Sequence, residues 1–318
     1  MFIDVFNGDA DGICALHQLR LVEPVESQLV TGIKREINLL QKVEAGANDY
    51  VLVLDISLDK NREALYRMLK AGVIVTYFDH HFAGDIPQHP NLTTRIDTRP
   101  SVCTSLLVNE ALQGAYLPWA VTAAFGDNLY DSAMHAAESL GLSEQQLEKL
   151  KILGTCINYN GYGASLDDLF YHPADLYKRI KPYSDPFDFI EHDEAFLRLK
   201  TGYEDDLANA VRVKPEFSSN DTAVFILPDK PWARRVSGIY GNDLARNNPG
   251  RAHAVLTRIN DNAYQVSVRA PLKTKTGADT ICRQFETGGG REAAAGINVL
   301  PGSEVERFMK LFHQHYTP

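Results

Sequence analysis

The chain has 318 residues, of which 44% are hydrophobic and 23% are charged, and its 32 basic and 41 acidic side chains give a net charge of −9. This length can hold two domains with full cores, and the acidic balance favours a small phosphorylated ligand over a long nucleic acid, whose binding needs a basic stripe. No apolar run approaches the roughly 18 residues of a membrane span and the N-terminus shows no signal-peptide pattern, so we expect a cytoplasmic protein with no membrane partner.

Short apolar runs alternate with helical patterns in the first half of the chain. We expect buried strands at Phe2–Phe6, Tyr50–Leu54 and Gly72–Phe78, because continuous apolar runs are typical of strands that are covered on both faces. Helical patterns follow at Ile13–Leu19 and Asn61–Leu69. This alternation predicts an α/β fold with a doubly wound parallel sheet.

The middle of the chain has a mainly helical pattern. Apolar spacing predicts helices from Ser101 to about Lys151. The segment Asn158–Gly163 reads as a turn. Tyr159 and Tyr162 on this turn could stack on a nucleobase.

A second, smaller α/β domain is expected at residues 221–318. It follows an N-terminal domain at 1–195 and a linker at 196–220, and we expect a cleft between the two domains. The elements predicted for it are strands at Ala223–Leu227, Ala252–Ile259 and Ala263–Ala270, a short helix at Gly241–Asn247, and a helix at Thr280–Phe285 that is capped by Asp279.

Acidic residues stand at or just after the ends of the three N-terminal strands. In chain order these clusters are Asp9-Ala10-Asp11-Gly12, Asp55 and Asp79-His80-His81. The carboxyl ends of parallel strands meet at one edge of the sheet, where ligands bind. Carboxylates that converge there repel one another unless a cation neutralises them.

The residue types in these clusters are those of a divalent-cation site. Asp9 and Asp11 lie two residues apart on a turn and can reach two different ions, which Asp55 can bridge. A nitrogen ligand from His80 suits Mn²⁺ better than Mg²⁺, although Mg²⁺ is possible. Two ions about 3.5–4 Å apart stabilise both the attacking and the leaving oxygen of a phosphoryl group. The sequence therefore predicts a two-metal hydrolase.

These motifs resemble the DHH phosphoesterase superfamily. Asp79-His80-His81 is the name motif, Asp9-Ala10-Asp11-Gly12 resembles the first motif, Asp55 the second, and Asp127 in Phe125-Gly126-Asp127-Asn128 the fourth. The resemblance implies that the metal ligands are Asp9, Asp11, Asp55, His80 and Asp127. It also implies catalytic roles for Asp79 and for His81, which would contact the phosphate or polarise a water molecule.

The first motif departs from the superfamily pattern. Many members have a histidine four residues before the first aspartate, and others have an aspartate two residues before it. Those positions are Val5 and Asn7 here. Asn7 offers a neutral carbonyl oxygen and is a candidate ligand, but we expect the first metal site to be weakened or to hold water instead.

A glycine run near the C-terminus predicts a phosphate-binding loop. Gly288, Gly289 and Gly290 let the backbone approach a ligand and direct several N–H groups at it. Arg291 follows, and a guanidinium suits phosphate. Arg269 stands on the polar face of the strand before the run.

The same segment resembles the DHH-associated C-terminal domain. Ala294-Ala295-Gly296 follows the glycine run as in that domain, and the arginine-bearing strand also matches. The signature histidine is replaced by Arg291, which implies an altered specificity. The resemblance implies that Arg269 and the Gly288–Arg291 loop bind the substrate.

Four cysteines lie far apart and have no paired spacing. They therefore predict neither a disulfide framework nor a cysteine zinc site. We expect free, buried thiols at Cys14, Cys103, Cys156 and Cys282.

The expected function is that of a Mn²⁺-dependent phosphodiesterase acting on very short 5′-phosphorylated nucleotides, as oligoribonuclease and dinucleotide phosphodiesterase members do. The favoured substrate is the linear dinucleotide pGpG, cut to GMP, because the guanidinium of Arg291 can pair with guanine. Two alternatives remain: a 5′→3′ single-strand exonuclease of the same superfamily, and a nucleotide-binding sensor that has lost turnover. A homodimer is also left open.

Overall fold

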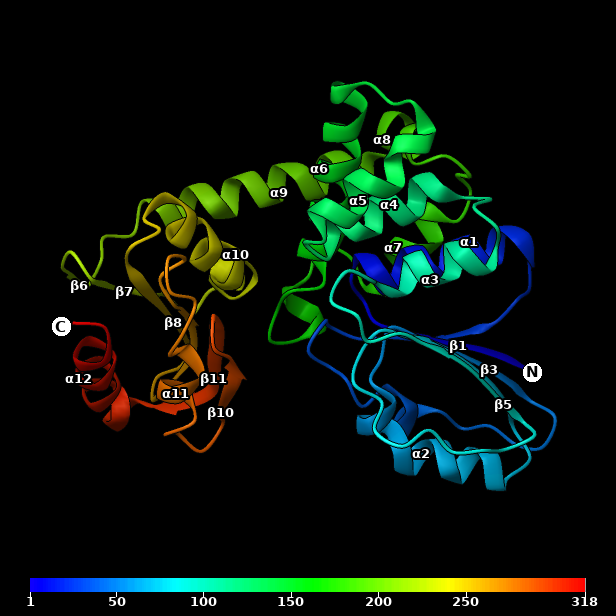
Figure 1. The fold of residues 1–318 in the computed structure, drawn as a ribbon, viewed down its shortest axis with the longest axis horizontal. Helices are drawn as coiled ribbons and strands as arrows, with labels where there is room; N and C mark the ends of the chain where they lie inside the picture. Colours follow the sequence, from blue (N-terminus) through cyan, green and yellow to red (C-terminus); the bar gives the residue numbers. More distant parts are fainter. Residues whose placement is uncertain (318) are drawn as a thin grey trace. The chain divides into compact units, whose positions relative to one another are not determined.

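The computed structural model describes residues 1–317, and the chain divides into two compact units, Met1–Gly202 and Tyr203–Pro318. Helix α9 (Glu194–Val211) runs through the division (Figure 1). Each unit has its own sheet and its own hydrophobic cores.

The N-terminal unit is built on a five-stranded parallel sheet with the order β2-β1-β3-β4-β5. Its strands are β1 (Phe2–Phe6), β2 (Gln28–Val30), β3 (Tyr50–Leu54), β4 (Ile74–Asp79) and β5 (Leu92–Ile96). In the register, Phe6 of β1 lies opposite Leu54 of β3, which lies opposite Phe78 of β4. Because these strand ends are level, the residues that follow them meet at one edge.

Helices cover both faces of this sheet, as the sequence predicts (Figure 1). Helices α1 (Ala10–Val22) and α3 (Thr104–Ala111) pack on the face of Phe6. Helix α2 (Leu58–Lys70) and the 3₁₀ turn η1 (Leu39–Lys42) pack on the face of Val5. The expected doubly wound α/β fold is confirmed.

Five further helices of this unit pack beside α1 and α3. They are α4 (Leu117–Gly126), α5 (Tyr130–Ala137), α6 (Glu144–Asn160), α7 (Pro173–Ile180) and α8 (Pro186–His192), with 3₁₀ turns η2 (Glu138–Leu140) and η3 (Leu166–Asp168). Helix α4 approaches α1 closely, since a Cβ on Gly126 would lie 2.5 Å from Cβ of Ala10. This contact places Asp127, which directly follows α4, beside the start of α1.

The turn expected at Asn158–Gly163 is partly wrong, because residues 158–160 complete α6. Gly161 and Gly163 suggested an earlier helix end, but α6 continues to Asn160. Tyr159 is fully buried, so its proposed stacking on a nucleobase is also wrong. Tyr162 lies just beyond the helix.

The C-terminal unit contains a six-stranded mixed sheet with the order β10-β11-β9-β8-β7-β6. Its strands are β6 (Phe217–Ser218), β7 (Thr222–Leu227), β8 (Ala252–Asn260), β9 (Ala263–Arg269), β10 (Gly288–Arg291) and β11 (Ala294–Pro301). Strands β7 and β8 pair in parallel through the crossover helix α10 (Pro231–Asn247). Helices α11 (Ala278–Cys282) and α12 (Val305–Tyr316), with the 3₁₀ turn η4 (Gly302–Glu304), pack over a core separate from that of α10.

Two helix predictions in this unit need correction. Helix α10 begins at Pro231 rather than at Gly241, since a proline suits the first helical turn and the glycines within the helix are tolerated. Helix α11 is capped by Gly277, whose φ of 96° favours glycine, so Asp279 lies inside the first turn instead of capping it.

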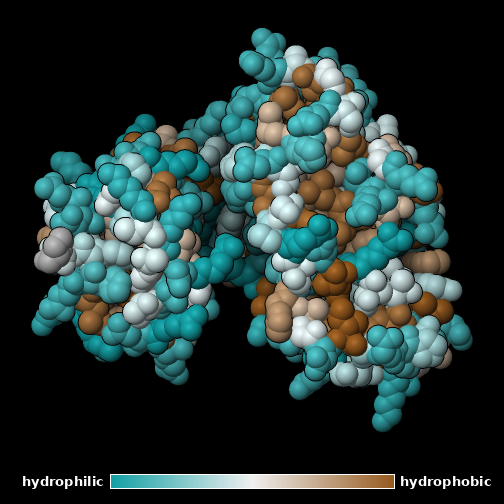
Figure 2. Space-filling model, viewed as in Figure 1, coloured by the Kyte–Doolittle hydropathy of each residue, from teal (hydrophilic) through white to brown (hydrophobic). Residues whose placement is uncertain are grey.

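The surface in view is mainly hydrophilic, with hydrophobic residues scattered over it (Figure 2). All four cysteines are free and buried, as the sequence predicts. Within residues 1–317, no helix combines the length and the apolar character that crossing a bilayer requires.

Candidate metal centre

The candidate centre lies where the winding of the parallel sheet reverses. In the order β2-β1-β3-β4-β5, the chain builds outward from β1 on one side and then from β3 on the other. Ligands of open α/β sheets bind at such a point, outside the carboxyl ends of the strands. Asp9 and Asp11 follow β1 here, and Asp55 follows β3 directly.

Asp9 is fixed by the start of helix α1. It is the N-cap residue, and its Oδ1 accepts the backbone N–H groups of Asp11 and Gly12, each at 3.1 Å. Glycine is required at position 12, because a Cβ there would lie 2.2 Å from the carbonyl oxygen of Asn7. The cap therefore orients one carboxylate oxygen of Asp9 and leaves Oδ2 facing away from the helix.

Asp11 caps a different helix from the one on which it stands. Its Oδ2 accepts the N–H of Thr104 and its Oδ1 accepts the N–H of Ser105, both at 2.7 Å. These are the first two residues of α3, whose own N-cap residue, Cys103, makes no side-chain cap hydrogen bond. A carboxylate at a helix N-terminus interacts favourably with the helix dipole, and the two hydrogen bonds orient both oxygens of Asp11.

Asp55 takes a left-handed backbone conformation, with a φ of 60°. Aspartate tolerates this region better than most residues, and the turn directs its side chain into the cluster, where Oδ1 accepts a hydrogen bond from Thr104 Oγ1 at 3.2 Å. Burial, together with the negative charges of Asp11 and Asp9, raises the pKa of Asp55 well above its usual range. A cation at this position would remove that penalty.

His80 presents one ring nitrogen to the carboxylates. Its Nδ1 lies 2.9 Å from the carbonyl oxygen of Val102 and donates to it, which leaves Nε2 as the atom that faces the cluster. Nε2 lies 3.3 Å from Asp55 Oδ1, 3.8 Å from Asp127 Oδ2 and 4.0 Å from Asp11 Oδ2.

These separations fit a divalent cation. Ligand atoms with bonds of about 2.1 Å to one ion lie about 3–4 Å apart. The atoms offered by Asp11, His80 and Asp127 all lie within 4.8 Å of one another. Burial lowers the pKa of His80, but its hydrogen bond to Asp55 and the nearby carboxylate charges outweigh burial and raise the pKa to about 10. The cluster thus favours positive charge at this place.

Asp79 and His81 form a pair beside these ligands. His81 Nδ1 lies 2.7 Å from Asp79 Oδ1, and the ring of His81 remains 44% exposed. Asp79 is fully buried, and its Oδ2 has no hydrogen-bond partner within residues 1–317. His81 Nδ1 is also 3.8 Å from Asp55 Oδ1. The catalytic roles predicted for this pair stay predictions.

Lys34 belongs to the cluster although no motif pointed to it. Its Nζ lies 2.6 Å from Asp9 Oδ2, 2.9 Å from Asn158 Oδ1 and 3.3 Å from Asp127 Oδ1. Burial raises the pKa of Asp9, but the charge and hydrogen bond of Lys34 outweigh burial and lower it. Lys34 stands on an irregular segment between β2 and η1, so neither periodicity nor spacing marks it.

Asn7 borders the cluster without joining any predicted ligand. Its Nδ2 donates to the carbonyl oxygen of Lys34 at 3.5 Å, a long contact. Its Oδ1 is buried and has no hydrogen-bond partner in the described part of the chain. The role of Asn7 as a ligand therefore stays a prediction.

The glycine run of the C-terminal unit is a strand, and the expectation of an open loop is wrong. Strand β10 pairs with β11, with Gly288 opposite Ile297 and Arg291 opposite Ala294. A Cβ on Gly288 would lie 1.7 Å from the carbonyl oxygen of Cys282, so this glycine serves close packing. A Cβ on Gly289 would meet nothing within 4 Å. Arg291 is exposed at the end of the hairpin strand.

Arg269 is fixed against helix α10. Its Nε donates to Asn242 Oδ1 at 2.6 Å, Nη1 to Ser267 Oγ at 2.9 Å, and Nη2 to the carbonyl oxygen of Gly238 at 3.1 Å. The guanidinium is therefore rigidly oriented at the end of β9. Substrate binding by Arg269, Arg291 and the glycines stays a prediction.

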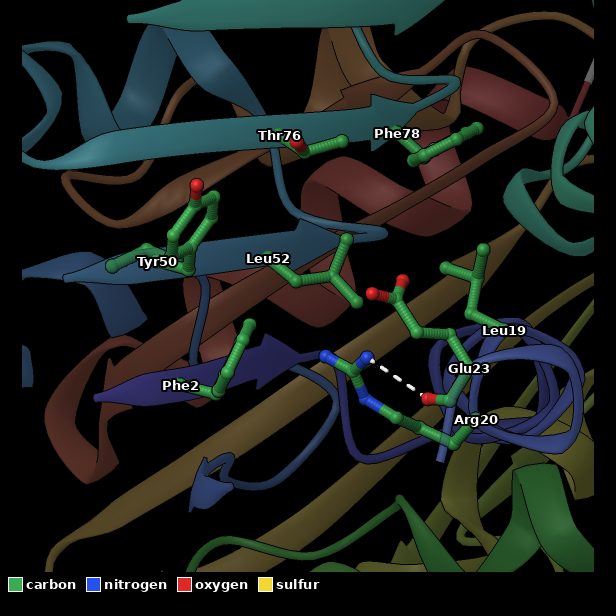
Figure 3. Close-up of a pocket in the computed structure, with 9 residues that line it drawn as sticks. Phe2, Leu19, Arg20, Glu23, Tyr50, Leu52, Thr76 and Phe78 are labelled. Atoms are coloured by element: carbon green, nitrogen blue, oxygen red, sulfur yellow. Dashed lines mark hydrogen bonds between the residues drawn. The ribbon is translucent and has the colours of Figure 1, made fainter. Parts of the chain in front are cut away.

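A separate pocket of about 410 Å³ lies on the parallel sheet (Figure 3). It is lined by residues of β1, β3 and β4, including Phe2, Tyr50 and Thr76, and by Arg20 and Glu23 at the end of α1. The residues that line it include no member of the carboxylate cluster.

Solved structures share the fold of this chain. It aligns with exonuclease RecJ bound to manganese at a TM-score of 0.63 and 16% identity, over 100% of this chain and 90% of that one. It aligns with PggH, a pGpG-specific phosphodiesterase from Vibrio cholerae, at a TM-score of 0.58 and 14% identity, over 99% of both chains. An exopolyphosphatase-related protein from Bacteroides fragilis aligns at a TM-score of 0.51 and 14% identity, over 98% of this chain and 90% of that one.

Neither a protein-family model nor a curated protein matches the sequence. The identities to the solved structures are 16% or lower, so the likeness shows the fold. It confirms the two-unit α/β fold that the sequence predicts.

Proposed function

We propose that this protein is a metal-dependent phosphodiesterase that hydrolyses very short 5′-phosphorylated nucleotides. The observation that carries the proposal is the position of His80 Nε2, which lies 3.3–4.0 Å from carboxylate oxygens of Asp55, Asp127 and Asp11. This spacing fits one divalent cation, and it occurs at the point of the sheet where ligands bind.

The donor set favours Mn²⁺, with Mg²⁺ as the alternative. Carboxylate oxygens suit both ions, and the imidazole nitrogen of His80 shifts the preference toward Mn²⁺. The ion would supply the Lewis acid that polarises a phosphoryl oxygen and activates a water molecule. Asp11 and Asp55 are held in place beforehand by their contacts with α3, so the protein does not need to reorganise around the ion.

Asp79 and His81 would act on the phosphate from beside the ligands. The hydrogen bond from His81 Nδ1 to Asp79 fixes the ring and its tautomer. The other ring nitrogen of the half-exposed His81 can then hydrogen-bond to a phosphate oxygen or to a water molecule.

For the substrate we propose a linear dinucleotide such as pGpG, cut to GMP. The net charge of −9 is unfavourable for long nucleic acid. Arg269 and the segment Gly288–Arg291 would contact the phosphate and the base, and an arginine can pair with the O6 and N7 atoms of guanine. The likeness to a pGpG-specific phosphodiesterase supports this choice.

A 5′→3′ single-strand exonuclease is the second candidate, favoured by the likeness to exonuclease RecJ. The two candidates differ in how the rate depends on substrate length. A dinucleotide enzyme cuts only the shortest substrate, whereas the rate of an exonuclease rises with each further nucleotide that it binds.

The test is length-resolved cleavage of 5′-phosphorylated oligonucleotides of two to about ten nucleotides, with added Mn²⁺. Hydrolysis confined to dinucleotides supports the first candidate, and rates that rise with length support the exonuclease. Tight nucleotide binding without any turnover would contradict both and would indicate a sensor. His80→Ala is the control that links the observed activity to the candidate centre.

A further inference from the structure

The carboxylate of Asp9 faces a different cationic group from the one that the other ligands of the cluster face. His80 Nε2 lies within 4.0 Å of oxygens from Asp11, Asp55 and Asp127. Asp9 instead directs Oδ2 at the ammonium of Lys34, at 2.6 Å. Two cationic positions are therefore distinguishable, one beside His80 and one beside Asp9.

The ammonium of Lys34 is fully satisfied where it lies. An ammonium has three N–H donors, and three side-chain oxygens stand around this one, from Asp9 at 2.6 Å, Asn158 at 2.9 Å and Asp127 at 3.3 Å. Nζ also lies 5.7 Å from the centre of the Tyr162 ring, within the range of a cation–π contact. A lysine with this set of partners is a structural part of the centre.

Asp127 joins the two cationic positions. Its Oδ2 faces His80 and its Oδ1 contacts Lys34, at 3.8 Å and 3.3 Å respectively. A carboxylate arranged in this way is typical of a bridge between two cations, and here one of the two cations is an amino acid side chain.

A second metal ion beside Asp9 would have to bind the same oxygens that surround the ammonium of Lys34, and the residue four positions before Asp9 adds no ligand. Val5, on the strand before Asp9, is completely buried in the apolar core on the α2 side of the sheet. An ion bound to Asp9 Oδ2 would also lie close to the ammonium, and like charges at short range repel. Lys34 would have to leave its three partners before the ion could bind.

We propose that the centre holds one divalent cation, beside His80, and that the ammonium of Lys34 replaces a second ion beside Asp9. This inference rests on the proposed function and departs from the two-metal site that the sequence predicts. Lys34 supplies a fixed positive charge for the phosphoryl oxygens and cannot supply a water nucleophile. Activation of the water therefore belongs to the single ion with Asp79 and His81.

The first test counts Mn²⁺ bound to the wild-type protein, by isothermal titration calorimetry and by elemental analysis after dialysis. We expect one ion per chain and no exchange-coupled signal in the Mn²⁺ electron paramagnetic resonance spectrum. Two ions per chain would overturn the inference while leaving the phosphodiesterase intact. If no ion binds and no nucleotide is cut, the proposed function itself fails.

The second test replaces the ammonium. In Lys34→Ala, Asp9 loses its counter-charge, and we expect the count to rise to two ions with a coupled-pair spectrum. Lys42→Ala is the matched control, since Lys42 pairs with Glu36 outside the cluster. The number of Mn²⁺ ions bound to this control should stay at one. A folded Lys34→Ala protein that still binds one ion contradicts the inference. Should that variant not fold, the wild-type count still decides.

Discussion

Three candidate ligands of the N-terminal unit, Asp9, Asp11 and Asp55, are buried and accept hydrogen bonds from residues of α1 or α3, whereas Arg291 of the C-terminal unit is exposed at the end of a hairpin strand. Asp11 shows the first arrangement, with both carboxylate oxygens bound to N–H groups of α3. Arg269 is intermediate, since it is oriented by α10 but stands at a strand end.

This difference separates chemistry from recognition. Preorganised groups act where charge develops, because no reorganisation is needed during the reaction. Exposed groups contribute to binding and are screened by solvent. We therefore expect substitutions in the first region to change metal binding and kcat, and substitutions in the second to change KM.

The largest effect is expected for His80→Ala. The substitution removes the proposed nitrogen ligand, so activity should fall by about 1,000-fold or more, and Mn²⁺ should no longer raise the melting temperature. Calorimetric titration and hydrolysis assays measure both. His135→Ala is the control, because His135 is an exposed histidine of α5. An active His80→Ala protein would place the chemistry elsewhere.

Asp79→Asn tests the pair that stands beside the proposed metal ligands. The loss of the carboxylate releases His81 from its 2.7 Å contact and from a single tautomer. We expect kcat to fall by about 10- to 100-fold with little change in KM. Steady-state kinetics provide the measurement, and an effect on KM alone would show that Asp79 acts in substrate binding.

The buried His17 contrasts with His80, because its pKa is lowered whereas the carboxylates around His80 raise the pKa of that residue. Burial of His17 lowers its pKa from 6.5 to about 4, against a smaller opposing effect of its hydrogen bond to Tyr183. The unfolded chain takes up this proton below about pH 6.5 and the folded chain only below about pH 4, so the free energy of unfolding falls as the pH drops through this window.

His17→Gln keeps a donor for Tyr183 and removes the titration. Between pH 7 and pH 5 the variant should lose about 2 kcal/mol less of its unfolding free energy than the wild type loses. Urea unfolding at several pH values provides the measurement, with exposed His135→Gln as the control. Equal pH profiles for His17→Gln and wild type would show that His17 titrates normally.

Arg269→Ala tests the more rigid of the two arginines. Because its guanidinium is oriented in advance, its loss should raise KM by about 10-fold and leave kcat nearly unchanged. Arg246→Ala is the control, since it removes an exposed arginine of the same helix that orients Arg269. A fall in kcat without a change in KM would remove the contrast between the two regions.

The smallest effect is expected for Arg291→Ala. An exposed side chain contributes little on its own, so KM should rise by about threefold, with a weaker preference for guanine over adenine in competition assays. Arg283→Ala is the control from the same unit. An unchanged preference would show that Arg291 does not read the base.

The parallel sheet could be predicted because its strands are continuous apolar runs. The bounds of β1 and β3 agree with the predicted Phe2–Phe6 and Tyr50–Leu54. Strand β5, Leu92–Ile96, contains two threonines and an arginine and lies at the sheet edge, so no apolar run marks it. Strand β10 consists of three glycines and an arginine, and glycine is depleted in strands.

Asp9, Asp11 and Asp55 were visible in the sequence because they follow strands that could themselves be predicted. Lys34 and Asn158 were not, since one lies on an irregular segment and the other near the end of a long helix. Their place depends on how α6 and the segment after β2 pack against α1. That arrangement arises from tertiary contacts, which the local pattern does not encode.

Asp11 reaches α3 across 93 residues of sequence, so the centre cannot exist in a partly synthesised chain. Until α3 has emerged and docked, its first amides and the carboxylate of Asp11 both remain hydrated, and the remaining ligand, Asp127, comes later still. The proposed cation would therefore find its complete set of ligands only after α3 and α4 have docked on α1.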